Sequence, residues 1–411
     1  MKTNLVAIVS PFCLFLFAGN ARADLEPFSL GASETISHDS NVGRTDDNPV
    51  SDWYATTELR GAVNQALGRD QLVGTAAINY TAYRRQVDKN LDAFGYRGAL
   101  ELDWSTIGDL SGSVGADAQR RRYNYGLADL SGSTQSSALE TDSHAFAKVR
   151  LGGNARWNVF AGFDANRRRF TGSTFVVNDE QQWSQNLGTT YSTSPDLSFG
   201  VTGNYVRGQY PNYATMPGNF NSKSLSATTK WQASGNSILN GSVGYTKQNS
   251  DLQAPLHFVN GGLSWNWAPP SHFSISAGVS RSTDGGVASS SVTSLNDRSL
   301  NTTGSFNVTY VLTAKVNLVA GAQYIHRKYD NVAVPNLLSD GFIDHANTSV
   351  ISGASNTSRF TLAAHYLPTR NSDVSCSVAH EARRAGSAQV KSFSSNYLDN
   401  LMQCAASINF D

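Results

Sequence analysis

The chain has 411 residues, with 32 acidic and 32 basic side chains and a formal net charge of zero. Because no basic excess exists to release counterions from a phosphate backbone, this balance argues against a nucleic-acid-binding protein. Only 16% of the residues are charged, while 35 are glycine and 16 are tyrosine, a composition unusual for a soluble α/β enzyme. No segment after residue 23 contains 18 consecutive apolar residues, which excludes helical membrane spans.

Residues 1–23 have the pattern of a secretory signal peptide. Lys2 supplies the positive charge, residues 5–19 form the apolar stretch, and residues 21–23 are a small-x-small cleavage site. An uncleaved membrane anchor is the alternative, although the apolar run is short and no second one follows. We therefore expect residues 24–411 to form one mature domain.

From Phe28 onward, small or apolar residues alternate with polar ones in segments of about ten residues. The clearest copy spans residues 96–122, where an apolar stripe at 96–104 is followed by a turn at 107–109 and a second stripe at 110–118. Soluble hairpins rarely alternate for about ten residues per arm with aromatic residues at the ends, whereas transmembrane β-strands do. The pattern is therefore typical of a hairpin in a membrane barrel.

Similar stripes follow in chain order. They lie at residues 28–32, 53–63, 72–80, 96–104, 110–118, 145–151, 157–165, 187–191, 197–205, 225–231, 259–267, 306–312, 316–324 and 402–410. The tight turns that join them lie at residues 67–70, 107–109, 152–154, 194–196, 234–236, 269–271, 313–315 and 368–371. The alternation is weak at residues 187–191 and 348–355.

Eight hairpins and unpaired first and last strands predict an all-β fold, a transmembrane antiparallel up-and-down β-barrel of 18 strands, with 16 as the alternative count. Only a closed barrel satisfies every backbone amide of such strands in lipid. An even count places both termini in the periplasm of a Gram-negative bacterium, with the tight turns on that side. The longest loops follow Asn41, Tyr125, Thr283 and Asp330, and they either constrict the pore or extend over the surface.

Arginine and lysine residues follow the apolar stripe of each strand that comes after a tight turn. The alternation predicts which charged and tyrosine residues face the lumen, both at these strand ends and further along the strands. They are Arg85, Arg121, Arg168, Arg327, Arg383, Tyr83, Glu101, Asp103, Asp117, Asp164 and Glu381. A ring of guanidinium groups would attract acidic solutes, and tyrosines would stack on sugar faces. The alternative is that the charges pair with lumenal carboxylates and bind lipopolysaccharide at the rim.

Motifs for catalysis or metal binding are absent from the sequence. It contains no G-x-S-x-G, H-E-x-x-H or C-x-x-C, and its eight histidines are scattered singly. We therefore expect no enzyme activity, no cofactor and no metal site.

Cys376 and Cys404 are the two cysteines of the mature chain, and both share parity with the lipid-facing residues of the last two strands. They are opposite each other if that hairpin is centred near Val390, and a periplasmic oxidant would then join them. Two unpaired thiols are the alternative, because opposite strand positions usually hold Cβ atoms wider apart than a disulfide prefers.

Phe410 ends the last alternating strand and resembles the C-terminal aromatic signal by which barrel proteins reach the outer-membrane assembly machinery. Asp411 follows it, which departs from a terminal aromatic residue.

Several stretches resemble the EpsL-type β-barrel porin family: residues 27–30, 38–44 and 80–85, and the strands that end in tryptophan with arginine and tyrosine after them. Members are encoded with exopolysaccharide biosynthesis machinery. The resemblance implies an outer-membrane channel that conducts a sugar polymer. In contrast to the family pattern, the loop after Asn41 is short and polar and no periplasmic repeat domain is attached, so export would require separate periplasmic partners.

Two functions therefore compete: a channel for exopolysaccharide export, and a passive porin for small solutes. An adhesin or structural barrel with a plugged lumen is a third interpretation. A width of about 16 to 18 strands is compatible with either channel, because such barrels leave an aqueous passage.

Overall fold

The computed structural model describes residues 27–84, 91–122, 139–152, 155–171, 176, 179–212, 218–251, 253–283, 299–337, 343–391 and 396–410. The predicted signal peptide and Asp411 lie outside these residues. The strands are β1 (Phe28–Asp39), β2 (Asp52–Leu67), β3 (Asp70–Tyr83), β4 (Ala93–Ser105), β5 (Leu110–Arg122), β6 (Leu139–Leu151), β7 (Trp157–Phe170), β8 (Glu180–Ser194), β9 (Leu197–Tyr210), β10 (Gly218–Ser234), β11 (Ser237–Ser250), β12 (Gln253–Trp267), β13 (Phe273–Thr283), β14 (Ser299–Thr313), β15 (Val316–Leu337), β16 (Ile343–Thr369), β17 (Ser372–Ala385) and β18 (Tyr397–Phe410). One helical turn, α1 (Ala388–Lys391), precedes β18.

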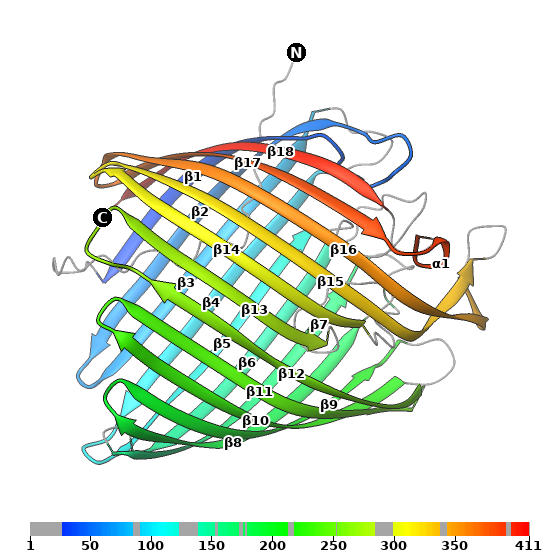
Figure 1. Cartoon of the computed structure of the whole chain (residues 1–411). Coiled ribbons are helices and arrows are strands. Elements are labelled where there is room, and N and C mark those ends of the chain that lie inside the picture. The colour runs from blue at the N-terminus through cyan, green and yellow to red at the C-terminus, as the bar shows by residue number, and fades with distance from the viewer. Residues whose placement is uncertain are drawn as a thin grey trace.

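These strands form one closed antiparallel barrel whose strands are strongly tilted (Figure 1). Each strand pairs with its neighbours in the sequence, and β1 pairs with both β2 and β18, which closes the sheet. The prediction of an up-and-down barrel with 18 strands is confirmed. Within the described ranges, no helix is long and apolar enough to cross a membrane.

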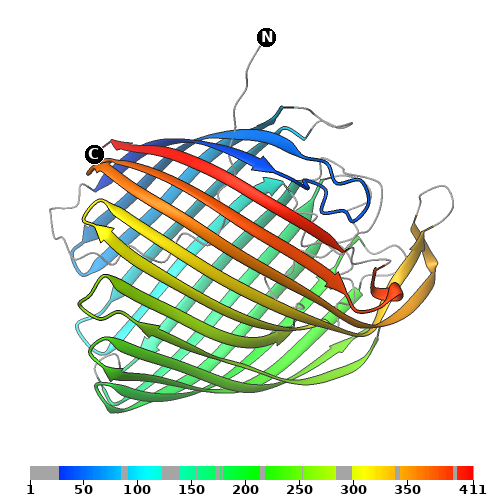
Figure 2. The same cartoon turned by 45° about the horizontal axis from the view of Figure 1, so that its top comes forward.

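The tight turns gather at one end of the barrel (Figures 1 and 2). Each of the eight predicted turns joins two consecutive strands, from β2 and β3 to β16 and β17. In the first of them, Gly68 has a φ of 71°, a left-handed conformation that glycine adopts without a Cβ clash. The C-terminal strand finishes at the same end, where Phe410 pairs with Leu30.

The connection after Asp330 corrects one prediction. It was expected to be a long loop, but β15 continues to Leu337 and β16 begins at Ile343, so the two strands form a hairpin that projects beyond the neighbouring strands (Figure 1). The β-branched residues of Val332-Ala333-Val334 favour this extension. The connections after Tyr125 and Thr283 lie outside the described residues.

The two faces of the wall differ in chemistry. Large exposed apolar side chains such as Leu100, Phe163, Leu187 and Leu263 recur at alternate positions, and the pairing register keeps them on the same face in adjacent strands. The intervening positions carry polar residues. Because only the outer face meets lipid in a barrel of this type, the apolar set marks the outside and the polar set the lumen.

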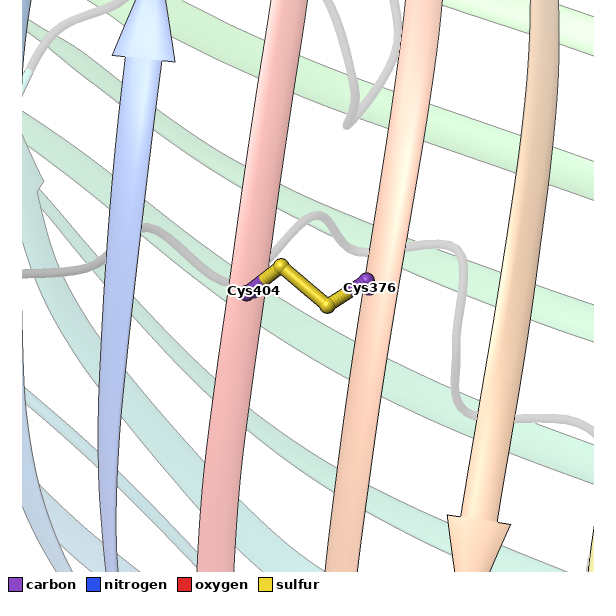
Figure 3. The surroundings of a disulfide bond; sticks show 2 residues. All are labelled: Cys376 and Cys404. Atoms are coloured by element: carbon purple, nitrogen blue, oxygen red, sulfur yellow. A yellow bond between two sulfur atoms is a disulfide. The ribbon is translucent and has the colours of Figure 1, made fainter.

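Cys376 and Cys404 pair directly across β17 and β18 and are joined by a disulfide (Figure 3). Their Cα atoms are 4.1 Å apart. In antiparallel sheets, pairs without mutual hydrogen bonds bring Cα atoms to about 4.5 Å, which also brings the side chains closer. The two sulfur atoms share the outward parity of Val378 and Met402, so the bond lies on the outer wall.

Candidate functional site: the barrel lumen

The inner face of β2–β8 is rich in charged residues, and we call this part of the wall the charged arc. Its inward-facing charged residues and histidine are Asp52, Glu58, Arg60, Arg97, Glu101, Asp103, Asp117, Arg121, Glu140, Asp142, His144, Lys148, Arg150, Asp164, Arg168 and Glu180. Positive and negative groups alternate around this arc, so most of the charge is compensated locally.

Glu140 is the centre of the densest ion cluster of the charged arc. Its side chain is only 1% exposed, and its carboxylate lies 3.3 Å from Arg121 Nε and 3.1 Å from Arg168 Nε. Arg168 also reaches Asp142 at 3.1 Å and Glu180 at 3.7 Å. Carboxylates therefore hold Arg121 and Arg168 in place. Of the two arrangements considered from the sequence, this is pairing with lumenal carboxylates and not a ring of unpaired arginines around the pore.

Deeper in the lumen, His144 lies between two carboxylates. Its Nδ1 is 2.8 Å from Asp117 and its Nε2 is 3.3 Å from Asp164. The side chains of Ser184 and Asn186 donate to the second oxygen of Asp164 at 3.3 and 3.4 Å. The network ties β5, β6, β7 and β8 together and leaves its carboxylates facing the lumen.

A second pair in this arc joins β2 to β4. Arg97 donates to Glu58 at 2.8 Å, and the Glu58 side chain is buried while that of Arg97 is about half exposed. Glu101 and Asp103 share the inward parity of Arg97 and lie further along β4 toward the tight turns.

The strands β15–β18, which close the barrel, carry the other predicted arginines that the structure describes, Arg327 and Arg383. Arg383 is buried, donates to Thr357 at 3.4 Å and lies over the Tyr397 ring. Glu381 accepts a hydrogen bond from Tyr397 and lies 3.6 Å from Arg359. Arg327 donates to Asn301 at 3.0 Å.

The loop after Asn41 folds onto the inner side of the wall. Its Val42 packs against the buried side chains of Tyr54, Tyr83 and Leu91, and Tyr54 and Tyr83 have inward parity. Of the two interpretations of this loop, an inward constriction agrees with these contacts. The loop thereby narrows the end of the lumen opposite the tight turns.

Arg44 fastens this loop to β1 and β18. It lies 2.9 Å from Asp39 and 3.0 Å from Asp399. Burial alone would lower the pKa of Arg44, but the carboxylates of Asp39 and Asp399 outweigh it and raise that pKa. At the outside of the loop, a hydrogen bond from Lys391 to Asp46 raises the pKa of that lysine.

The inner face of β9–β14 is almost uncharged, and we call it the neutral arc. Its inward-facing residues are mainly serine, threonine, asparagine and glycine, and Lys230 is the one charged residue at an inward position of these six strands. A groove of about 620 Å³ runs along this arc. Hydroxyl and amide side chains such as Thr228, Asn240, Ser264 and Ser280 line it.

The structure groups the predicted lumenal residues unevenly. Arg121, Asp117, Asp164 and Arg168 belong to the charged arc, whereas Glu381 and Arg383 belong to the closing strands and Tyr83 to the packing under the loop after Asn41. Arg85 lies outside the described residues. The sequence pattern did not single out Glu140, although its inward parity in β6 alone would have placed it in the lumen.

Among the residues that the structure describes, no group of three histidine, cysteine or acidic residues is placed to hold a metal ion.

No family model and no curated protein matches the chain. The fold is similar to that of outer-membrane barrels of known structure. The outer membrane protein OpdK from Pseudomonas aeruginosa is 11% identical, with a TM-score of 0.50 over 93% of this chain and 99% of that one. An improved structure of the same protein, OccK1, gives the same values. The FrpB iron transporter from Neisseria meningitidis is 11% identical over 87% of this chain and 62% of that one, with a TM-score of 0.46.

Proposed function

We propose that the chain is a passive channel for small hydrophilic solutes in the outer membrane of a Gram-negative bacterium. The supporting observation is the inner face of the closed barrel, which carries polar residues on strand after strand. Barrels of about 16 to 18 strands are wide enough for an aqueous passage between their side chains. Both termini then lie in the periplasm, and the loop after Asn41 faces the outside.

Selectivity in such a channel follows from the balance of charges in the lumen. The guanidinium groups of Arg121 and Arg168 are engaged by carboxylates, and the neutral arc adds the single charge of Lys230. Paired charges of both signs produce little net potential along the passage. We therefore expect weak discrimination between small anions and cations.

Liposome swelling tests this proposal. Vesicles that contain the refolded chain are expected to swell in isotonic monosaccharide, and more slowly as the sugar becomes longer. Empty vesicles and vesicles with heat-denatured chain are the controls. Folded barrels that give no swelling with any sugar would contradict the channel.

A second candidate is conduction of a sugar polymer, suggested by the resemblance to EpsL-type porins and supported by the groove of the neutral arc. Hydroxyl and amide groups hydrogen-bond sugar hydroxyls without trapping them by charge. This candidate requires periplasmic export partners. A deletion strain distinguishes the two functions: reduced exopolysaccharide in the medium supports polymer export, whereas unchanged polymer and slower uptake of small sugars support the passive channel.

A further inference from the structure

The outer wall of β4–β9 has a hollow of about 1240 Å³. Its floor consists of small residues with outward parity, Gly98, Ala116, Ala118, Ala145 and Ala165, which pair with one another across the strands. Larger outward side chains stand at its sides, among them Leu100, Phe163 and Trp183. A barrel wall of uniform large side chains would be convex here, so the small residues create the depression.

A second hollow of about 1130 Å³ continues the first toward the tight turns. The two share Phe163 and Gln185. This second hollow is lined by outward-facing residues such as Val149, Leu187 and Tyr205. Together they form an apolar trough on a surface that faces lipid. We call both hollows together the outer trough.

Cations lie at the end of the outer trough away from the tight turns. Arg167 and Arg207 line the first hollow, and Lys223 lines the second hollow, which lies nearer the tight turns. All three are exposed. Within the described part of the chain no carboxylate forms a close ion pair with any of them, and Asp179 interacts with Arg167 only through its longer-range charge. Lys223 is 5.9 Å from the Tyr205 ring centroid.

The height of these cations corresponds to a membrane interface. Arg167 follows Trp157 by ten residues on β7. At about 3.3 Å per residue and a tilt of about 40°, this separation is about 25 Å along the barrel axis, the height of the apolar band in outer-membrane barrels. With Trp157 at the periplasmic interface, Arg167 lies at the outer one.

One pairing in this region is unfavourable without an anion. Lys223 and Lys247 are directly opposite each other on β10 and β11, both with outward parity. Like charges directly opposite across two strands destabilise a sheet. Among the described residues, no carboxylate lies close enough to offset the repulsion between Lys223 and Lys247. A bound anionic group would offset it.

We propose that the outer trough binds a phosphorylated acyl lipid of the outer leaflet, with its acyl chains along the small-residue floor and its phosphates at Arg167, Arg207 and Lys223. The chemistry is that of lipid A: its acyl chains suit the apolar floor, and its phosphate groups suit the three cations. Charge-assisted hydrogen bonds from arginine to phosphate are short and frequently bidentate, which holds the headgroup at this one place on the rim.

Native mass spectrometry of the purified chain in detergent tests the site, with diphosphorylated lipid A as the probe. Arg167→Ser combined with Arg207→Ser is expected to weaken retention of lipid A about 25-fold, since each basic residue near a membrane surface contributes about fivefold. The matched control is Arg281→Ser combined with Lys328→Gln, two outward cations on β13 and β15 away from the trough. The control is expected to retain the lipid as the unmodified chain does.

The apolar part of the trough is tested separately by Ala116→Phe, which fills the floor without changing a charge. This variant is expected to lose lipid A retention while its heat-modifiable migration on gels, which shows that the barrel has folded, stays unchanged. Equal losses in the control pair would overturn a localised site. Displacement of lipid A by millimolar inorganic phosphate, equal retention of dephosphorylated lipid A, or a dimer that Ala116→Phe abolishes would each overturn the lipid assignment. Because the readout is lipid retention, it is independent of the channel proposal.

Discussion

The charged arc and the neutral arc are built from the same kind of strand, yet they present opposite chemistry to the lumen. On their outer faces both carry apolar residues at alternate positions, because lipid imposes that requirement on every strand. On their inner faces the charged arc places a dense ion cluster around Glu140, whereas the neutral arc offers serine, threonine and asparagine. The comparison shows that the membrane constrains every second residue and leaves the others to set stability and permeation.

The largest difference between the two arcs is expected in stability. Glu140→Gln leaves Arg121 and the largely buried Arg168 without their shared carboxylate. Removing one partner of a buried ion pair typically costs about 3–5 kcal/mol, and we expect the lower figure because Asp142 and Glu180 still reach Arg168. Equilibrium unfolding in urea from lipid vesicles measures the effect.

The matched change in the neutral arc is Thr246→Val, at a buried inward position of β11. It keeps the side-chain volume and removes one hydroxyl, so a loss of at most about 1 kcal/mol, the net contribution of one ordinary hydrogen bond, is expected. If Thr246→Val lowers the free energy of unfolding as much as Glu140→Gln does, the two arcs contribute equally to stability. That result would contradict the expected larger contribution of the charged arc.

A smaller effect is expected on ion selectivity. Asp117→Asn combined with Asp164→Asn removes two lumenal carboxylates beside His144. The permeability ratio of cations to anions is expected to fall about fivefold, which corresponds to about 1 kcal/mol. This energy is that of two unit charges about 15 Å apart at an effective dielectric constant of about 20. Reversal potentials in a salt gradient across a planar bilayer give this ratio.

The reciprocal variant places charge in the neutral arc. Ser242→Asp combined with Ser264→Asp adds two carboxylates to the groove wall, and the permeability ratio is expected to rise by a similar factor. If neither double variant changes the reversal potential, the ions do not pass along these arcs.

The smallest effect is expected on sugar flux. Gly278 lies on the neutral arc, and a Cβ built there has its nearest neighbours at 3.5 Å, so Gly278→Phe fits the wall and projects a ring into the groove. The swelling rate of vesicles in disaccharide is expected to fall about threefold, equivalent to less than 1 kcal/mol. The ion permeability ratio is expected to stay constant, which separates obstruction of the groove from a change in charge.

The strand pattern was readable from the sequence because it has a local cause. Alternation about Tyr96–Trp104 and the turn at Gly108 each depend on neighbouring residues. The sequence left open whether Cys376 and Cys404 are paired, because that depends on where their hairpin is centred, and the structure places them opposite each other. Short turns fix the register of both strands, so parity alone assigned lumen and lipid faces.

The side-chain partners were not readable in the same way. Arg121 and Glu140 meet across β5 and β6, whose connection is long, so nothing local sets their register. Arg44 binds Asp399, which lies at the other end of the chain and becomes a neighbour only when the barrel closes. The inward fold of the loop after Asn41 depends on the same closure.

The central claim is that the lumen conducts, and single-channel recording of the purified chain in planar lipid bilayers tests it most directly. We predict stepwise insertion events followed by a steady conductance that is proportional to voltage, because charges of both signs and neutral polar groups line the passage. The loop after Asn41 narrows the outer end, so deleting residues 42–50 is expected to raise the conductance of each step. Folded barrels that insert without any conductance, and stay silent after this deletion, would contradict the account.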